Sequence, residues 1–243
     1  MDFVRVPAGE FLMGSDRIKD PAAYDNELPQ HLVTLPEYWI GRTEVTVDQF
    51  SAYVSSSRAK TRASNDLANK ADHPVVSVSW DDCNAFCEWV TRLGSGEVAL
   101  PSEAEWEKAA RGTDGRIYPW GNTAPIETRL NFGGGIGTTT PVGKYGASGS
   151  SPSGCVDMAG NVWEWTRSLW GGTDSKPDYG YPYPTRQAVR ENLEADRDVL
   201  RVLRGGAFQF SAQNVRCAFR SAYLPSLRMD LLGFRVILRL PSL

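Results

Sequence analysis

The sequence predicts one α+β domain with little regular structure. Helix-capping patterns begin three segments, and strand-like alternation occurs near both ends. The 23 glycines, 15 prolines and 8 tryptophans indicate loops that are held by large aromatic anchors. A chain of 243 residues can bury a sizeable core. Because no linker or internal repeat divides the chain, we expect a single domain over residues 1–243.

Strands are expected where apolar and polar residues alternate. Residues 3–13 predict a strand that is interrupted at Pro7 and then resumes. Short strands are also predicted over 31–35 and 199–204. Apolar residues occupy every second position over 234–240, which predicts a final strand at the end of the chain.

Three helices are predicted from their starting residues, Thr46, Ser79 and Ser102. Thr46 and Ser102 are each followed three residues later by Gln or Glu, which is the pattern of a capping box. Gly112 is expected to end the third helix. Because capping accounts for the carboxylates at the start of that helix, Glu103 and Glu105 are not predicted to be catalytic acids. The second helix should present one buried face, made of Cys83, Phe86, Cys87 and Val90.

Composition and charge exclude several function classes. The net charge of −3 and the pI near 5.5 argue against nucleic acid as the main partner. No run approaches the roughly 18 apolar residues of a membrane span. The first seven residues lack the regions of a signal peptide. The glycines at 133–137 are not followed by the GK[ST] of a phosphate-binding loop, so no such loop is expected.

The four cysteines leave three interpretations open, and their positions are Cys83, Cys87, Cys155 and Cys217. Buried free thiols are favoured over a disulfide or a metal site. No CxxC pair exists, so a zinc cage would need ligands from scattered positions. The two histidines, His31 and His73, lie in unrelated segments and do not predict a facial iron site.

The C-terminal stretch alternates between two kinds of sequence. The blocks 204–208, 215–220 and 233–236 carry glycines and arginines, as a scaffold would. The residues between the blocks show no helical or strand period, which is typical of a contact surface. Residues 201–243 contain seven arginines and one acid. These arginines are expected to be structural, with an anion-binding surface as the alternative. The competing hypothesis for the apolar residues of the contact surface is that they pack inside: Phe210, Phe219, Tyr223 and Leu227.

Six motifs occur in order along the chain, over 7–14, 74–80, 100–107, 119–122, 160–165 and 233–236. Together they resemble the formylglycine-generating-enzyme (sulfatase-modifying-factor) domain. The resemblance runs nearly end to end and is broken mainly by an insertion near 172–198. It implies a variant of the C-type lectin fold, loop-rich and α+β, in which the N- and C-terminal strands lie close together.

The resemblance also bears on catalysis. The family's enzyme uses two cysteines after its Arg-Gly-Gly motif to bind copper and oxidise a substrate cysteine, but residues 207–215 contain no cysteine here. We therefore expect no copper, no iron and no enzymatic activity. A metal-dependent oxidase-type enzyme is the disfavoured alternative. Cys217 and Cys87 match family positions whose disulfide partners appear here as Ala110 and Val236, respectively, which supports free thiols.

Calcium is a second implication of the resemblance. The family binds Ca²⁺ through the segment that matches 157–164, which implies the ligands Asp157, Gly160, Val162 and Glu164. The alternative is a buried salt bridge between Glu164 and an arginine of the C-terminal stretch. The family's other calcium site is not predicted, because glycines and threonines follow Phe132.

The alternation of the C-terminal stretch resembles the variable proteins of diversity-generating retroelements. This resemblance implies a variable region over 208–231, a non-catalytic ligand-binding function and an unknown macromolecular ligand, with a protein favoured. A bacterial, archaeal or phage origin is expected, with surface display as an option. Gln209, Gln213 and Met229 do not fit codons diversified from asparagine. The predicted binding surface consists of Phe208, Phe210, Ser211, Asn214, Phe219, Ser221, Ala222, Tyr223, Leu224, Ser226, Leu227, Asp230 and Leu231.

Overall fold

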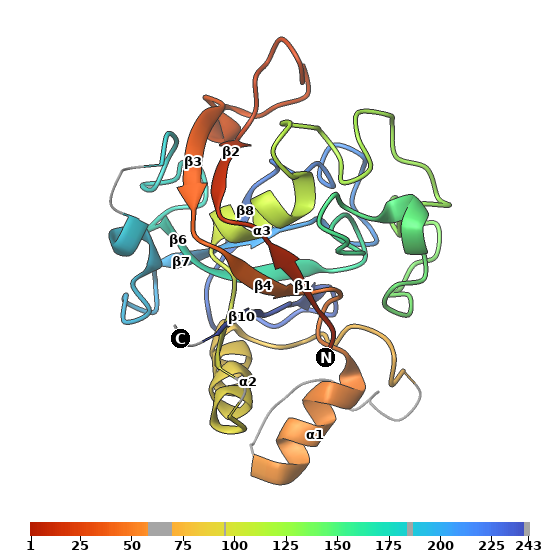
Figure 1. Cartoon of the computed structure of the whole chain (residues 1–243), viewed down its shortest axis with the longest axis vertical. Helices are drawn as coiled ribbons and strands as arrows, with labels where there is room; N and C mark the ends of the chain where they lie inside the picture. Colours follow the sequence, from red (N-terminus) through yellow and green to blue (C-terminus); the bar gives the residue numbers. More distant parts are fainter. Residues whose placement is uncertain (58–69, 95, 184–186, 241–243) are drawn as a thin grey trace.

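Both ends of the chain meet in one antiparallel sheet. A computed structural model describes residues 1–57, 70–94, 96–183 and 187–240 (Figure 1). The sheet has the strand order β1-β4-β10-β5. Its strands are β1 (Phe3–Val6), β4 (Tyr38–Gly41), β10 (Ile237–Arg239) and β5 (Glu97–Ala99). The first and last strands therefore lie on either side of β4, which confirms the expected closeness of the terminal strands.

The structure confirms one predicted strand together with its interruption and shortens another. The segment 3–13 breaks at Pro7 into β1 and β2 (Gly9–Met13), and β2 pairs with β3 (His31–Leu35) in a separate two-stranded sheet. The strand predicted over 234–240 was too long, because only β10 forms there. Residues 234–236 instead cross between two sheets, since Leu232 and Gly233 pair with a strand of the second sheet. Their apolar side chains alternate because they enter the core, and they do not extend the strand.

The second four-stranded sheet carries the C-terminal stretch. Its order is β8-β7-β6-β9, with β8 (Ser221–Tyr223), β7 (Leu200–Arg204), β6 (Trp163–Gly171) and β9 (Leu232–Gly233). The β7 strand confirms the prediction for 199–204. The central strand β6 was not predicted as a strand. All nine of its residues are buried, so it lacks the alternation by which a half-exposed strand is recognised.

The three predicted helices are present as α1 (Val47–Ser57), α2 (Trp80–Arg92) and α3 (Glu103–Arg111). Thr46 and Gln49 exchange the hydrogen bonds of a capping box, as do Ser102 and Glu105. Gly112 caps α3 with φ +69°, which confirms its predicted role. Short 3₁₀ segments cover Asp25–Glu27, Gly146–Gly149 and Gln187–Glu191. Within the described ranges, no helix has the length and apolar character needed to cross a bilayer.

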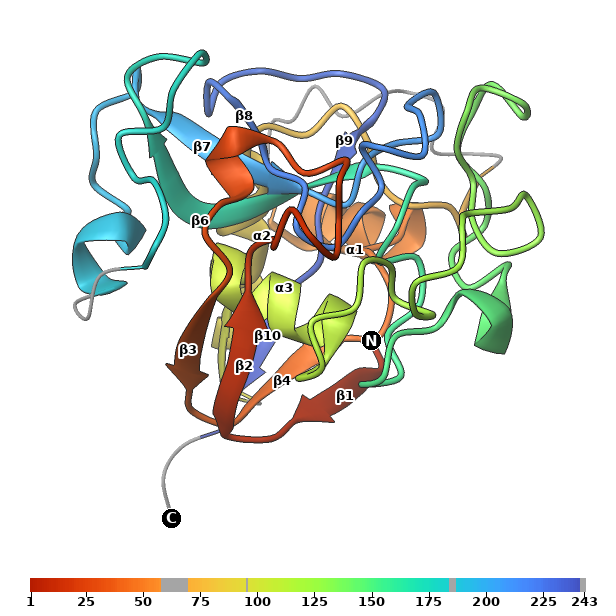
Figure 2. The ribbon, with the colours of Figure 1, turned by 90° about the horizontal axis from the view of Figure 1, so that it is seen from above.

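The helix α3 occupies the centre of the molecule. All nine of its residues are buried, and it lies between the β2–β3 hairpin and the sheet that contains β6 and β7 (Figure 2). A separate aromatic core packs α1 against α2 through Phe50 and Phe86, whose ring centroids are 5.7 Å apart, and Phe234 joins them from the C-terminal stretch. The C-terminal stretch thus packs against α1 and α2, and its arginines pair with acids of α3.

Candidate functional site

The buried acids of α3 hold the arginines of the C-terminal stretch. Glu103 accepts hydrogen bonds from Arg220 Nη2 at 3.0 Å and from Arg204 Nη1 at 3.4 Å. One turn later, Glu107 pairs with Arg204 and with Arg111. These side chains are 0–2% exposed. Capping alone therefore does not explain Glu103, which was a partial error of the sequence analysis: its carboxylate binds the scaffold, and only Glu105 closes the capping box.

Two further arginines secure the scaffold to distant segments. Arg216 donates to Glu27 at 2.6 Å and to Asp20 at 2.7 Å, which ties the loop after β2 to the C-terminal stretch. Arg235 forms a two-point pair with Glu164, with distances of 2.6 and 2.7 Å. Such bidentate pairs fix both position and orientation. The structural interpretation of the C-terminal arginines is thereby confirmed for these buried members.

The predicted contact residues lie outside this buried scaffold, with two exceptions. Phe208 is 6% exposed and Leu231 is 1% exposed, so these two side chains belong to the core and not to a surface. Each is next to a buried residue in the sequence, Phe208 to Ala207 and Leu231 to Leu232. The remaining positions are exposed or half-buried, and we call them the C-terminal face: Phe210, Ser211, Asn214, Phe219, Ser221, Ala222, Tyr223, Leu224, Ser226, Leu227 and Asp230.

Aromatic side chains form the centre of the C-terminal face. The buried ring of Trp163 contacts Phe210 and Phe219, with centroid distances of 5.3 and 5.7 Å. Leu224 is 45% exposed, whereas Tyr223 and Leu227 are half-buried. The hypothesis that all the apolar residues pack inside fails for these side chains, because each retains part of its surface in water. They rest on the core without being enclosed by it.

Sequence analysis missed one aromatic neighbour of this face. Tyr24, in the loop between β2 and β3, packs edge-on against Phe219 at 5.4 Å and is 43% exposed. Figure 2 shows this loop beside the segment that joins β7 to β9. Gln213 Nε2 also donates to the Ala22 carbonyl at 3.2 Å. Nothing in the local sequence around Tyr24 indicates that contact, because the two segments are almost two hundred residues apart.

One of the predicted calcium ligands, Glu164, forms a buried ion pair with Arg235. Both oxygens of Glu164 accept hydrogen bonds from Arg235, and Oε2 also accepts one from Trp106 at 2.7 Å. Asp157 accepts a hydrogen bond from the Gly143 amide. The salt bridge that was the alternative for Glu164 is therefore present. Both oxygens of Glu164 are thus engaged in hydrogen bonds, although Oε1 accepts only one, and calcium binding stays a prediction.

The carboxylate of Glu44, near the segment 157–164, has one oxygen without a hydrogen-bond partner among the described residues. Glu44 is 1% exposed, and its Oε1 accepts from Asn161 at 3.1 Å, whereas its Oε2 has no partner among the residues that the structure describes. Burial raises the pKa of Glu44 well above its ordinary value, and the nearby Asp157 carboxylate adds to the shift. The segment 157–164 thus lies in an acidic, oxygen-rich part of the interior.

All four cysteines are buried free thiols, as predicted. Burial raises the pKa of Cys155 to about 11 and that of Cys217 to about 12, and it also raises the pKa values of Cys83 and Cys87. A thiol with such a pKa is protonated at neutral pH and is a poor nucleophile and a poor ligand for soft metals. In this structure the four thiols therefore have the burial of structural cysteines.

The two histidines lie apart, as the sequence indicated. His31 packs against Tyr181 and Tyr183, whereas the ring of His73 bonds to Thr139 Oγ1 at 2.9 Å. Among the described residues, no group of three or more His, Cys, Asp or Glu side chains is arranged to hold a metal ion.

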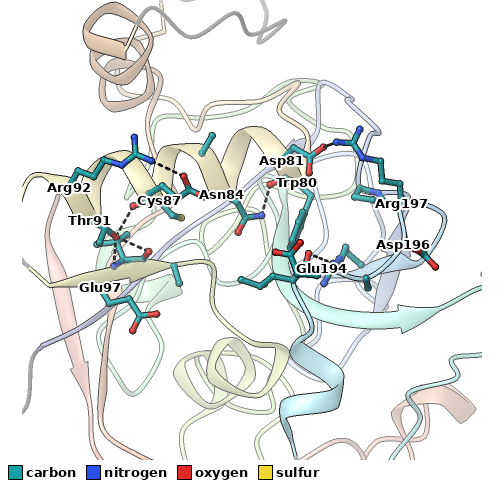
Figure 3. Close-up of a pocket in the computed structure, with 18 residues that line it drawn as sticks. Trp80, Asp81, Asn84, Cys87, Thr91, Arg92, Glu97, Glu194, Asp196 and Arg197 are labelled. Atoms are coloured by element: carbon teal, nitrogen blue, oxygen red, sulfur yellow. Dashed lines mark hydrogen bonds and ion pairs between the residues drawn. The ribbon is translucent and has the colours of Figure 1, made fainter.

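A large hollow lies beside α2. It has a volume of about 860 Å³ and lies between α2, β5 and the segment 193–197 of the predicted insertion (Figure 3). Two of its arginines pair with acids of α2, since Arg92 is 3.1 Å from Glu88 and Arg197 is 3.9 Å from Asp81. The hollow shares only Pro225 with the predicted variable region, and no sequence motif pointed to it.

Comparison with known proteins places these features among relatives. The sequence model of the sulfatase-modifying factor enzyme 1-like domain matches residues 1–240. Hercynine oxygenase of Mycobacterium tuberculosis is 31% identical over 93% of this chain, which spans only 58% of the relative's length. Formylglycine-generating enzyme of Streptomyces coelicolor is 30% identical, and the match covers 96% of this chain and 87% of the relative.

Solved structures share the fold over nearly the whole chain. PvdO from Pseudomonas aeruginosa has a TM-score of 0.78 and 26% identity, with 98% of this chain and 94% of that chain covered. Treponema denticola variable protein 1 has a TM-score of 0.72 and 24% identity, with the same coverage. The α+β, loop-rich fold inferred from the motifs is therefore confirmed.

Proposed function

The chain belongs to the family of the sulfatase-modifying factor enzyme 1-like domain, and on that premise we propose that this member is a non-catalytic ligand-binding protein. Its binding surface is the C-terminal face, and its ligand is a macromolecule, most simply another protein. The residues of this face are diversified, as in the variable proteins of retroelements that the alternating sequence resembles.

One observation carries the proposal: the scaffold blocks are mostly buried, whereas the residues between them are mostly exposed or half-buried. Within 215–220 every residue except Phe219 is buried, whereas the residues of 209–214 are exposed or half-buried. A surface that tolerates change needs this separation, because substitutions in a packed core cost several kcal/mol and exposed ones cost little. Large aromatic side chains at the centre also suit recognition, since they offer contact area at a low cost in conformational entropy.

A displayed library tests the proposed function. Five codons of the C-terminal face would be randomised, those of Phe210, Phe219, Tyr223, Leu224 and Leu227. A matched library would randomise five buried scaffold codons, those of Val215, Arg216, Cys217, Ala218 and Arg220. We expect the first library to yield folded clones that bind hen-egg lysozyme after selection, and the second to yield few folded clones. A first library that does not fold, or that gives no binder, would contradict the proposal.

The alternative function is an oxidase-type enzyme, because two of the relatives are named as enzymes. It is disfavoured by the raised thiol pKa values and by the absence of cysteine from 207–215. Calcium is compatible with the binding proposal, as a structural ion near the segment 157–164. There it would bridge hard oxygen ligands and add to the stability of the folded state.

Metal analysis separates these possibilities. We expect the purified chain, after treatment with EDTA, to gain thermal stability when calcium is added and not when magnesium is added. We expect no stoichiometric copper or iron and no oxygen uptake with a cysteine-containing peptide. Oxygen uptake with bound copper or iron would overturn the non-catalytic proposal, whereas an unchanged melting temperature would refute calcium binding alone.

A further inference from the structure

A small hollow opens at the edge of the C-terminal face. It has a volume of about 180 Å³ and is lined by the start of α1, the segment 74–76 and the loop 137–139. Two residues of the C-terminal stretch complete it, namely Phe208 and Asp230. Phe208, which is not part of the surface, is thus a wall of a pocket. Asp230 is the single member of the C-terminal face that lines the same pocket.

The pocket combines an apolar lining with two opposite charges. Val75 and Phe208 are 1% and 6% exposed and supply buried apolar walls. The Lys70 ammonium donates to Thr138 Oγ1 at 3.0 Å, which holds it against the loop 137–139. Asp230 is exposed. Within the part of the chain that the structure describes, no ion pair joins Lys70 or Asp230 to another residue.

We propose that this pocket receives a phenol side chain, that of a tyrosine on the protein ligand. The inference rests on the proposed function, because it names one contact of the same binding surface. A phenol ring would pack against Phe208, where aromatic pairs gain beyond simple burial. Its hydroxyl can donate to the Asp230 carboxylate or accept from the Lys70 ammonium, since a hydroxyl is both donor and acceptor.

Other side chains match the pocket less well. An aliphatic or phenylalanine side chain would bury apolar surface but leave both charges without a partner. An ammonium or a carboxylate group would meet one like charge as well as one opposite charge, so its attraction to one is offset by its repulsion from the other. Asp230 is therefore a specificity-determining residue. Because it is the pocket residue that faces diversification, its replacement would change the preferred side chain while the other walls stay the same.

The test uses N-acetyl-L-tyrosinamide as the probe, titrated into the full chain and followed by amide chemical shifts. We expect saturable shifts at Val76, Thr138 and Thr139 with millimolar affinity. N-acetyl-L-phenylalaninamide, which lacks the hydroxyl, should bind about tenfold more weakly, in line with the loss of a hydrogen bond to a charged group. N-acetyl-L-lysinamide should not shift these amides.

Two variants identify the group responsible. Asp230→Ala should weaken the tyrosine probe about tenfold and should remove its advantage over the phenylalanine probe. Asp174→Ala serves as the matched control, because Asp174 is exposed but does not line the pocket, and it should change nothing. Equal affinity for the two probes, shifts confined to other residues, or no shifts at all would overturn the proposal.

The two proposals can fail separately. The display library leaves Asp230 and Lys70 unchanged, so binders that arise there without any response to the tyrosine probe would refute the pocket alone. A normal probe response together with a library that yields no binder would refute the diversified surface and leave a phenol-binding pocket.

Discussion

Replacing Glu103 by glutamine should lower the free energy of unfolding by about 3–5 kcal/mol at pH 7. The substitution leaves the guanidinium groups of Arg204 and Arg220 buried without their shared carboxylate. Breaking one partner of a buried ion pair is costly because the remaining charge stays out of water. The matched control is Glu88→Gln, whose partner Arg92 is 76% exposed, and its effect should stay below about 1 kcal/mol.

The loss of unfolding free energy caused by Glu103→Gln should depend on pH. Burial acts to raise the pKa of Glu103, but the charges of Arg220 and Arg204 outweigh it and hold the pKa below its ordinary value. A lowered folded-state pKa stabilises the protein above the unfolded pKa of about 4.3, and this stabilisation is lost as the pH falls through the folded-state value. Urea unfolding should therefore show a gap between wild type and variant that narrows below about pH 4. A gap that stays constant or widens in acid would contradict the assignment.

The second large effect is expected at Gly160. A Cβ atom on this residue would lie 2.2 Å from the Asn131 carbonyl oxygen, and its backbone has φ +75°. Gly160→Ala should therefore cost about 3 kcal/mol or more, from the left-handed backbone and from the clash together. Gly133→Ala is the matched control, because Gly133 has φ +69° and open space around its Cα.

The Gly133→Ala control separates the cost of the steric clash at Gly160 from the cost of the left-handed backbone. Gly133→Ala should cost about 1–2 kcal/mol, which is the penalty of the backbone conformation alone. Thermal unfolding of both variants measures the difference. If the two substitutions destabilise the chain equally, the close approach of 131 and 160 is not rigid, and the loop that supports Trp163 is looser than described. This steric requirement for glycine holds whether or not the Gly160 carbonyl binds calcium.

Local signals in the sequence were sufficient for much of the fold. Capping residues located all three helices, since their side chains bond to backbone only three residues away. Alternation located β1 and β3, whose outer faces meet water. It failed for β6, which is buried on both faces, and for 234–236, where the chain passes between sheets.

The site was predicted in outline, and its details depend on long-range contacts. The predicted surface residues are exposed or half-buried, apart from Phe208 and Leu231, which are buried. The partners of the scaffold arginines could not be derived, because Glu27 and Glu103 lie more than a hundred residues away. The contact of Tyr24 with Phe219 and the pocket beside Asp230 likewise combine segments from both halves of the chain.

The most direct test of the central claim is the DNA next to the gene. We predict a near-identical copy of the segment that encodes 208–231, which differs from the gene only where the copy has adenine. The differences should fall in codons of the C-terminal face, such as those of Phe219, Tyr223 and Leu227, and spare the codons of Arg216 and Arg220. The absence of any copy, or differences concentrated in the buried scaffold codons, would contradict a diversified binding surface.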